Sequence, residues 1–316
     1  MKQLKYAAST PPAIHVKEPQ VALAFDTTTL PRVDARPIIK WAGGKTQLLP
    51  ILQRHLPPMG RVKRYFEPFV GGAAMFFFLQ HESSYLSDTN AEIINLYHVV
   101  RDCLDELQSA LQVHKRLNGE AYFYRIRSQD PATLSPVERA ARVIYLNKTC
   151  FNGLYRVNSK GQFNVPYGKY KNPNICDSAN LEAASLALRR AVLPESGQDY
   201  EIALSDAGTG DFIYFDPPYH PLNTTSSFTS YTDKSFTADD QARLALAFRR
   251  LHANGSFLMQ SNSDTPLIRA LYYGFRLEQI QANRSINSNG DKRGPVSELL
   301  IMNYSITGEI LHGWEE

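Results

Sequence analysis

The 316-residue sequence has only short apolar runs, three cysteines and a net charge of +3. Because a membrane-spanning helix needs about 20 consecutive apolar residues, these short runs exclude one. The first 36 residues are polar and lack the apolar core of a signal peptide, so we do not expect export. Cys103, Cys150 and Cys176 have neither metal-binding nor C-x-x-C spacing, which predicts free thiols in a reducing cytoplasm and no metal site.

Acidic residues are missing from one long segment, residues 139–176. The segment holds seven Lys or Arg, six Tyr or Phe and six Asn. Positive side chains neutralise phosphates, aromatic rings stack on bases, and amides pair with base edges. The alternative is a solvated basic surface loop. The aromatic and Asn content favours a nucleic-acid contact.

The order of apolar patterns predicts a doubly wound α/β sheet. A strand over 64–69 leads into a glycine turn and a helix, a second strand over 84–87 ends at Asp88, and an amphipathic helix spans 93–111. Helices are also expected near 180–191 and from Thr237. The remaining expected strands are 211–215, 256–260, 275–281 and 298–304.

This pattern divides the chain into a sheet domain, an insertion and a tail. Residues 1–36 are polar and rich in proline and threonine, which predicts a flexible tail. The catalytic domain is expected over 37–111 and 178–316. Residues 112–177 form the basic insertion, which is mostly helical and carries a predicted β-hairpin over 154–165.

Asp216-Pro217-Pro218-Tyr219 directly follows the apolar strand 211–215. Ligands bind open α/β sheets at the carboxyl ends of strands, and two successive prolines end the strand and make the segment rigid. The Asp216 carboxylate and the Pro217 carbonyl are suited to accept the two hydrogens of an amino group. Tyr219 offers a face on which an extruded base can stack. The motif therefore favours methyl transfer to an amino nitrogen over a simple proline-rich turn.

With this motif, residues 37–306 resemble the Dam-type (D12 class, alpha-group) site-specific DNA adenine-N6 methyltransferases. The resemblance implies a Rossmann-like S-adenosylmethionine-dependent methyltransferase sheet with an inserted, mostly helical target-recognition domain that carries a β-hairpin. In relatives, Ser in place of Asp216 is typical of cytosine-N4 enzymes and Asn is typical of protein-amide enzymes, so Asp216 indicates adenine N6. The absence of a Pro-Cys nucleophile argues against cytosine C5 chemistry.

Two further stretches, residues 40–45 and 67–73, resemble the cofactor motifs of this family. Together with Asp88 at the end of the next strand and with Asp216, they give the expected S-adenosylmethionine contacts Trp41, Lys45, Glu67, Phe69, Gly71, Asp88 and Asp216. Ala73 stands where the family usually has a second glycine. Asp88 is placed to bind ribose hydroxyls, with the cap of the helix at Ala91 as the alternative. The Gly43-Gly44-Lys45-Thr46 segment is not a nucleotide phosphate loop, because position 39 is Ile where that motif needs Gly.

Residues 146–171 resemble the family's target-recognition region. The resemblance implies that Arg156 binds guanine in a bidentate contact, Leu154 and Pro166 make apolar contacts, and Phe151 wedges into the base stack. It implies GATC as the target. The remaining implied DNA contacts are Lys40, Asn152 and Tyr170, with the basic loop 284–293 along the backbone. Asp206 resembles a position that touches the cofactor adenine, although its spacing to Asp216 differs.

The expected function is methyl transfer from S-adenosylmethionine to adenine N6 in double-stranded DNA, by base flipping. The product is S-adenosylhomocysteine, and no metal is expected. We expect a monomer that acts in the cytoplasm on DNA, without a membrane. The alternatives are a cytosine-N4 or protein-amide methyltransferase on the same fold, and a catalytically silent DNA-binding relative.

Overall fold

The computed structural model describes residues 31–222, 236–283, 295–305 and 307–311. Most of the predicted tail and the whole basic loop 284–293 therefore lie outside the described residues. Within the described ranges, no helix is long and apolar enough to cross a membrane. The three cysteines are free.

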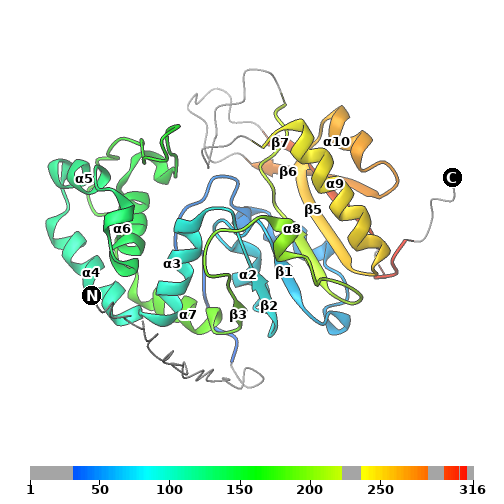
Figure 1. The fold of residues 1–316 in the computed structure, drawn as a ribbon, viewed down its shortest axis with the longest axis horizontal. Helices are drawn as coiled ribbons and strands as arrows, with labels where there is room; N and C mark the ends of the chain where they lie inside the picture. Colours follow the sequence, from blue (N-terminus) through cyan, green and yellow to red (C-terminus); the bar gives the residue numbers. More distant parts are fainter. Residues whose placement is uncertain (1–30, 223–235, 284–294, 306, 312–316) are drawn as a thin grey trace, which may run out of the picture.

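A seven-stranded sheet forms the centre of the molecule, in the order β3-β2-β1-β4-β5-β7-β6 (Figure 1). The strands are β1 (Tyr65–Glu67), β2 (Ser84–Leu86), β3 (Ala191–Val192), β4 (Phe212–Phe215), β5 (Phe257–Ser263), β6 (Arg276–Asn283) and β7 (Pro295–Met302). Strands β1 to β5 are parallel, whereas β7 runs antiparallel to both β5 and β6. The predicted α/β sheet is confirmed. The strand order reverses between β1 and β4, and such a switch point is where these sheets bind ligands.

Apolar residues cover both faces of the sheet. In β4, Phe212 and Tyr214 belong to one hydrophobic cluster, and Ile213 and Phe215 belong to the other. This alternation has the period of two that a strand imposes on its side chains. Among the described residues, the α-helices outside the segment that joins β2 to β3 are α1 (Leu49–Leu52), α2 (Ala74–Leu79), α8 (Tyr200–Ala203), α9 (Ala238–Ala253) and α10 (Pro266–Leu271).

Five helices separate β2 from β3 in the chain. They are α3 (Ala91–Asp102), α4 (Leu104–Leu117), α5 (Glu120–Arg127), α6 (Pro136–Thr149) and α7 (Ser178–Leu188). The single helix predicted over 93–111 is wrong, because Cys103 leaves the helical conformation (φ −133°, ψ 45°) and divides it into α3 and α4. Helix α6 begins at a capping box between Ser135 and Glu138.

The structure of residues 154–165 differs from the predicted β-hairpin. It contains an isolated antiparallel bridge between Val157 and Phe163 instead of two extended strands. The Asn158 side chain accepts hydrogen bonds from the backbone N–H groups of Lys160 and Gln162, at 2.9 and 3.0 Å. A side chain therefore holds this turn where a longer strand ladder was expected.

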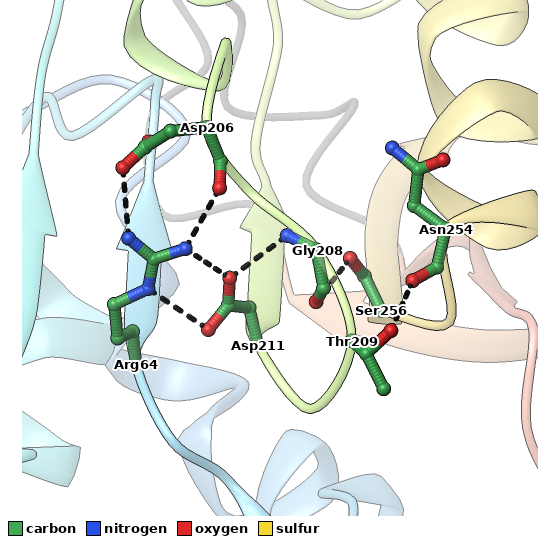
Figure 2. A network of polar contacts seen from close by, with 7 residues as sticks. All are labelled: Arg64, Asp206, Gly208, Thr209, Asp211, Asn254 and Ser256. Carbon is green, nitrogen blue, oxygen red and sulfur yellow. Dashed lines mark hydrogen bonds and ion pairs between the residues drawn. The ribbon is translucent and has the colours of Figure 1, made fainter.

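A polar network lies at the amino ends of β1 and β4 (Figure 2). Arg64 donates to both carboxylate oxygens of Asp211, at 3.0 and 2.6 Å, and to the side chain and backbone oxygens of Asp206, at 2.8 Å each. The Gly208 N–H also donates to Asp211. Asp206 thus belongs to a structural network at the end of β4 that lies opposite to Asp216. This position argues against the cofactor contact that its resemblance implies.

Candidate active site

Asp216 and Lys45 form an ion pair at the carboxyl end of β4. The Lys45 Nζ atom lies 2.7 Å from Asp216 Oδ1, and the two side chains are 4% and 20% exposed. Lys45 also donates to the carbonyl of Gly43, whose φ of +74° favours glycine and turns the chain tightly into the 3-10 helix Lys45–Gln47. The fold therefore joins the amino-terminal motif to the predicted catalytic motif.

The two buried carboxyl groups at this edge have different pKa values. Burial raises the pKa of Asp216 to about 6, although the nearby Lys45 cation opposes that rise. Burial raises the pKa of Glu67 to about 8, opposed by a 2.7 Å hydrogen bond from the Tyr65 hydroxyl and reinforced by the charge of Asp216. Burial thus disfavours the ionised form of both carboxyls, and the charge of Lys45 offsets part of that effect at Asp216.

A pair of buried amides clamps the backbone of the predicted catalytic motif. Gln241 on α9 donates to the Pro218 carbonyl at 2.9 Å and accepts from Asn262 on β5 at 3.0 Å. The Asn262 side chain in turn accepts from the His220 N–H at 3.1 Å. Both amide side chains are fully buried. The sequence analysis missed this clamp, although a polar residue on the apolar side of α9 was an available signal.

Two acceptor atoms lie beside the clamp. Among the described residues, no hydrogen bond reaches the Pro217 carbonyl or the Oδ2 atom of Asp216. The Tyr219 ring belongs to the same motif, and its centroid lies 4.9 Å from Lys45 Nζ. The motif thus presents two hydrogen-bond acceptors next to an aromatic ring, the set of groups that an amino-bearing base requires.

The glycine turn after β1 is bound to the end of β2. The Gly71 N–H donates to Asp88 Oδ2 at 3.0 Å, and the Asn90 N–H donates to Asp88 Oδ1 at 2.9 Å. Helix α3 is capped by Asn90, so the alternative role of Asp88 as the cap of that helix is wrong. Burial raises the pKa of Asp88. Ala73 has φ +55°, a left-handed conformation that explains why a glycine suits this position.

Aromatic residues line the same edge of the sheet. Trp41 packs so closely on the glycine turn that a Cβ atom added to Gly71 would lie 2.5 Å from Trp41 Nε1. The Trp41 ring centroid also lies 5.1 Å from that of Tyr155 in the insertion. Phe69 packs on Tyr200 with ring centroids 5.4 Å apart. Gly71, Trp41 and Phe69 are therefore placed at the carboxyl edge that carries Asp216.

One buried side chain ties the Lys40 segment to the insertion. Asn147 accepts from the Lys40 N–H at 2.8 Å, and donates to the carbonyls of Lys40 at 2.8 Å and Gly153 at 3.0 Å. Gly153 has φ +64°, and an added Cβ atom there would lie 2.5 Å from Lys40 Cδ. The sequence analysis did not identify this role of Asn147, which joins two segments with predicted DNA contacts.

The predicted recognition residues lie mainly on the surface of the insertion. Phe151 is 54% exposed, and its N–H donates to the Pro166 carbonyl at 2.9 Å. Arg156 donates through Nε to Asn164 Oδ1 at 2.7 Å, and its Nη groups have no hydrogen-bond partner among the described residues. The other members of the set are Asn152, Pro166 and Tyr170, which are exposed, and Leu154, which is half-buried.

The candidate site contains no metal cluster in the part of the chain that the structure describes, since no three His, Cys, Asp or Glu residues are grouped to hold an ion there. The ionisable groups at the carboxyl edge are instead a lysine, a set of carboxyls and tyrosines. What the site offers chemically is therefore hydrogen bonding, stacking and charge.

Known proteins match this chain over most of its length. Residues 41–286 match the family model for D12 class N6 adenine-specific DNA methyltransferases. The chain is 44% identical over 277 residues to the type II methyltransferase M1.LlaDCHI of Lactococcus lactis, covering 86% of this chain and 97% of that protein. It is 38% identical over 274 residues to the DNA adenine methylase of Vibrio cholerae, covering 84% of this chain and 95% of that protein. The corresponding Escherichia coli K12 protein is 36% identical over 269 residues, with the same coverage.

Proposed function

Since the chain belongs to the D12 class of N6 adenine-specific DNA methyltransferases, we propose that it methylates adenine N6 within GATC sites of double-stranded DNA, by base flipping. The observation that carries the proposal is the Asp216 carboxyl group, which lies 2.7 Å from the Lys45 ammonium, with the adjacent Pro217 carbonyl available as a second acceptor. Asp216 selects an amine as the group methylated, and the insertion selects the DNA site.

The residues at the carboxyl edge fit S-adenosylmethionine, which supplies the methyl group on a cationic sulfonium. The Trp41 indole and the Asp216 carboxylate suit a cation. Lys45 has three N–H donors, of which Gly43 and Asp216 take two, so one donor is left for the cofactor carboxylate. Asp88 suits the ribose hydroxyls. The remaining proposed cofactor contacts are Glu67, Phe69 and Gly71.

In the mechanism that we propose, the residues of the motif orient the target amine. The Asp216 carboxylate and the Pro217 carbonyl accept its two N–H hydrogens, so that the nitrogen lone pair points at the methyl group. The negative charge of Asp216 also stabilises the positive charge that develops on the nitrogen. Tyr219 stacks on the adenine ring, and the Gln241–Asn262 clamp keeps the backbone of the motif in place. Catalysis consists of positioning and electrostatics.

Recognition of the DNA site is assigned to the insertion. The two Nη groups of Arg156 suit the O6 and N7 atoms of a guanine, and the exposed Phe151 ring suits insertion into the base stack. Arg156→Ala should reduce discrimination between GATC and single-base variants. The control Lys160→Ala removes an exposed cation from the same turn and should weaken binding equally on all sequences. Equal loss of discrimination in both variants would contradict the assignment.

The test of the function uses unmethylated duplex DNA and labelled S-adenosylmethionine, with Asp216→Ala as the inactive control that still binds DNA. We expect N6-methyladenine, found by nucleoside analysis, at GATC sites mapped by sequencing. N4-methylcytosine, or label on protein, would overturn the proposal in favour of those methyltransferases. DNA binding without any cofactor binding by calorimetry would identify a silent relative. We also propose that the enzyme is a monomer and acts on DNA in the cytoplasm. Sedimentation of the enzyme tests its oligomeric state.

A further inference from the structure

We propose that Glu298 on β7 is a positioning residue for the methyl-transfer reaction, which sets the orientation of the Tyr219 ring through its hydroxyl. This inference rests on the proposed function, because it assigns Tyr219 the role of stacking on the target base. It adds a residue that lies 79 positions beyond the catalytic tyrosine in the chain. The sequence analysis assigned Glu298 only to a strand.

The Tyr219 side chain is held at two points by groups from different parts of the fold. Its hydroxyl donates to Glu298 Oε2 at 2.8 Å, and the Lys45 ammonium lies 4.9 Å from its ring centroid. The amide clamp fixes the backbone on both sides of Tyr219, at Pro218 and His220. With the backbone fixed, the hydroxyl contact determines which rotation of the ring is stable.

Glu298 is a rigid anchor because it lies inside the sheet. Its Cα atom is paired with Ser263 of β5 on one side and with Ile280 of β6 on the other. A carboxylate that accepts a hydroxyl proton makes a stronger hydrogen bond than a neutral acceptor does. A residue needed only for sheet structure at this position would require neither the charge nor the contact with Tyr219.

The charge of Glu298 also acts on Asp216. The ionisable groups that face Asp216 are Lys45, which lowers its pKa, and Glu298, which raises it. Among the residues that the structure describes, the set also includes Glu67 and Tyr65 on β1, Tyr214 on β4 and Tyr219; burial raises the pKa of each of them, and the charge of Asp216 raises it further. Replacing Glu298 by Gln should therefore lower the pKa of Asp216. This change follows from the charge of Glu298 alone, so it tests the electrostatic contact with Asp216, whereas the rates of the single and double variants at Tyr219 and Glu298 test the positioning role.

The experiment compares Glu298→Ala, Glu298→Gln, Tyr219→Phe and the double variant Tyr219→Phe/Glu298→Ala in single-turnover methyl transfer to duplex DNA. Loss of a hydrogen bond to a charged acceptor should slow Glu298→Ala and Tyr219→Phe by about 10- to 100-fold. The double variant should be no slower than the slower single variant, because both remove one contact. Glu298→Gln should keep most of the rate, since its amide oxygen still accepts, and its acid limb should move to lower pH.

Binding constants and a matched control separate positioning from folding. Dissociation constants for cofactor and for DNA should stay within about twofold of the wild type in both single variants. The control Glu278→Gln removes a carboxylate on the neighbouring strand β6, where it pairs with Arg276, and should keep the wild-type rate. If Glu298→Ala does not fold, the slowed rate of Tyr219→Phe and the retained rate of Glu298→Gln still decide the question.

The outcomes distinguish this inference from the function on which it rests. A wild-type rate in Glu298→Ala or in Tyr219→Phe, or multiplied losses in the double variant, would overturn the positioning role while adenine methylation by the wild type still stands. An unchanged acid limb in Glu298→Gln would count against the electrostatic contact with Asp216. If the wild-type enzyme transfers no methyl group to adenine in DNA, the proposed function fails first, and this inference fails with it.

Discussion

The Asp216 carboxylate should cost the folded protein stability, and the pH dependence of the stability of Asp216→Asn should reveal how much. The pKa of Asp216 rises from its ordinary value of 3.8 to about 6 on folding, mainly because the group is buried. The ionised form is thus disfavoured in the folded state. The stability that the protonated carboxyl contributes is complete below pH 3.8 and is lost as the pH rises through about 6. Asn has the size of Asp and carries no charge, so it removes this pH-dependent cost, while the loss of the ion pair with Lys45 adds a separate cost at every pH.

The size of the effect follows from the pKa. One pH unit of difference between folded and unfolded pKa values corresponds to about 1.4 kcal/mol, so the full cost above pH 7 is about 3 kcal/mol. The advantage of Asp216→Asn should therefore grow by about 2 kcal/mol between pH 4.5 and pH 8. The same variant should lose methyl transfer, because its amide lacks the negative charge.

The opposite end of the same strand offers a matched control. Asp211 precedes β4 and is paired with Arg64 at 2.6 Å (Figure 2). Asp211→Asn breaks this pair and should lower the unfolding free energy by about 3 kcal/mol at both pH values. Urea denaturation of the wild type and the two variants at pH 4.5 and 8 measures the differences. A stability difference between Asp216→Asn and the wild type that does not shift in favour of the variant from pH 4.5 to pH 8 would refute the reasoning.

Two other predictions concern contacts of the site. Lys45→Met removes the cation that lowers the pKa of Asp216, so the acid limb of kcat/KM should move to higher pH, and an unmoved limb would contradict the assignment. Asn147→Ala leaves backbone groups of Lys40 and Gly153 without their partner, so the unfolding free energy should fall by about 2–3 kcal/mol in urea titrations and DNA affinity should fall in gel-shift titrations. Wild-type values in both measurements would contradict this role.

The parts of the fold that were predictable have strong local signals. Strand β4 is a continuous apolar run, and α6 and α9 begin with capping boxes at Ser135 and Thr237. The division of α3 from α4 at Cys103 was not predictable, because the apolar period continues across that residue without a glycine or proline. The two-residue strand β3 is too short to show a period.

The candidate site divides in the same way. The D-P-P-Y motif and the glycine turn are each a continuous stretch of sequence, so their residue types alone indicated methyl transfer and cofactor binding. The contacts that hold them are long-range: Lys45 meets Asp216, Gln241 meets Pro218, and Glu298 meets Tyr219. No local pattern encodes such pairs, since they depend on the order of strands in the sheet.

The hydrogen bonds of Asn147 bear on how such enzymes can be recombined. In the proposed complex, the Lys40 segment and the insertion touch the same DNA, and one buried amide holds them together. A chimera that exchanges only the insertion would combine the Asn147 region of one relative with the Lys40 segment of another. The hydrogen bonds between these two segments would then join parts of different proteins. The unit of exchange for altering site preference is therefore discontinuous and includes the amino-terminal motif. The insertion boundary seen along the chain is not the boundary of a transferable module.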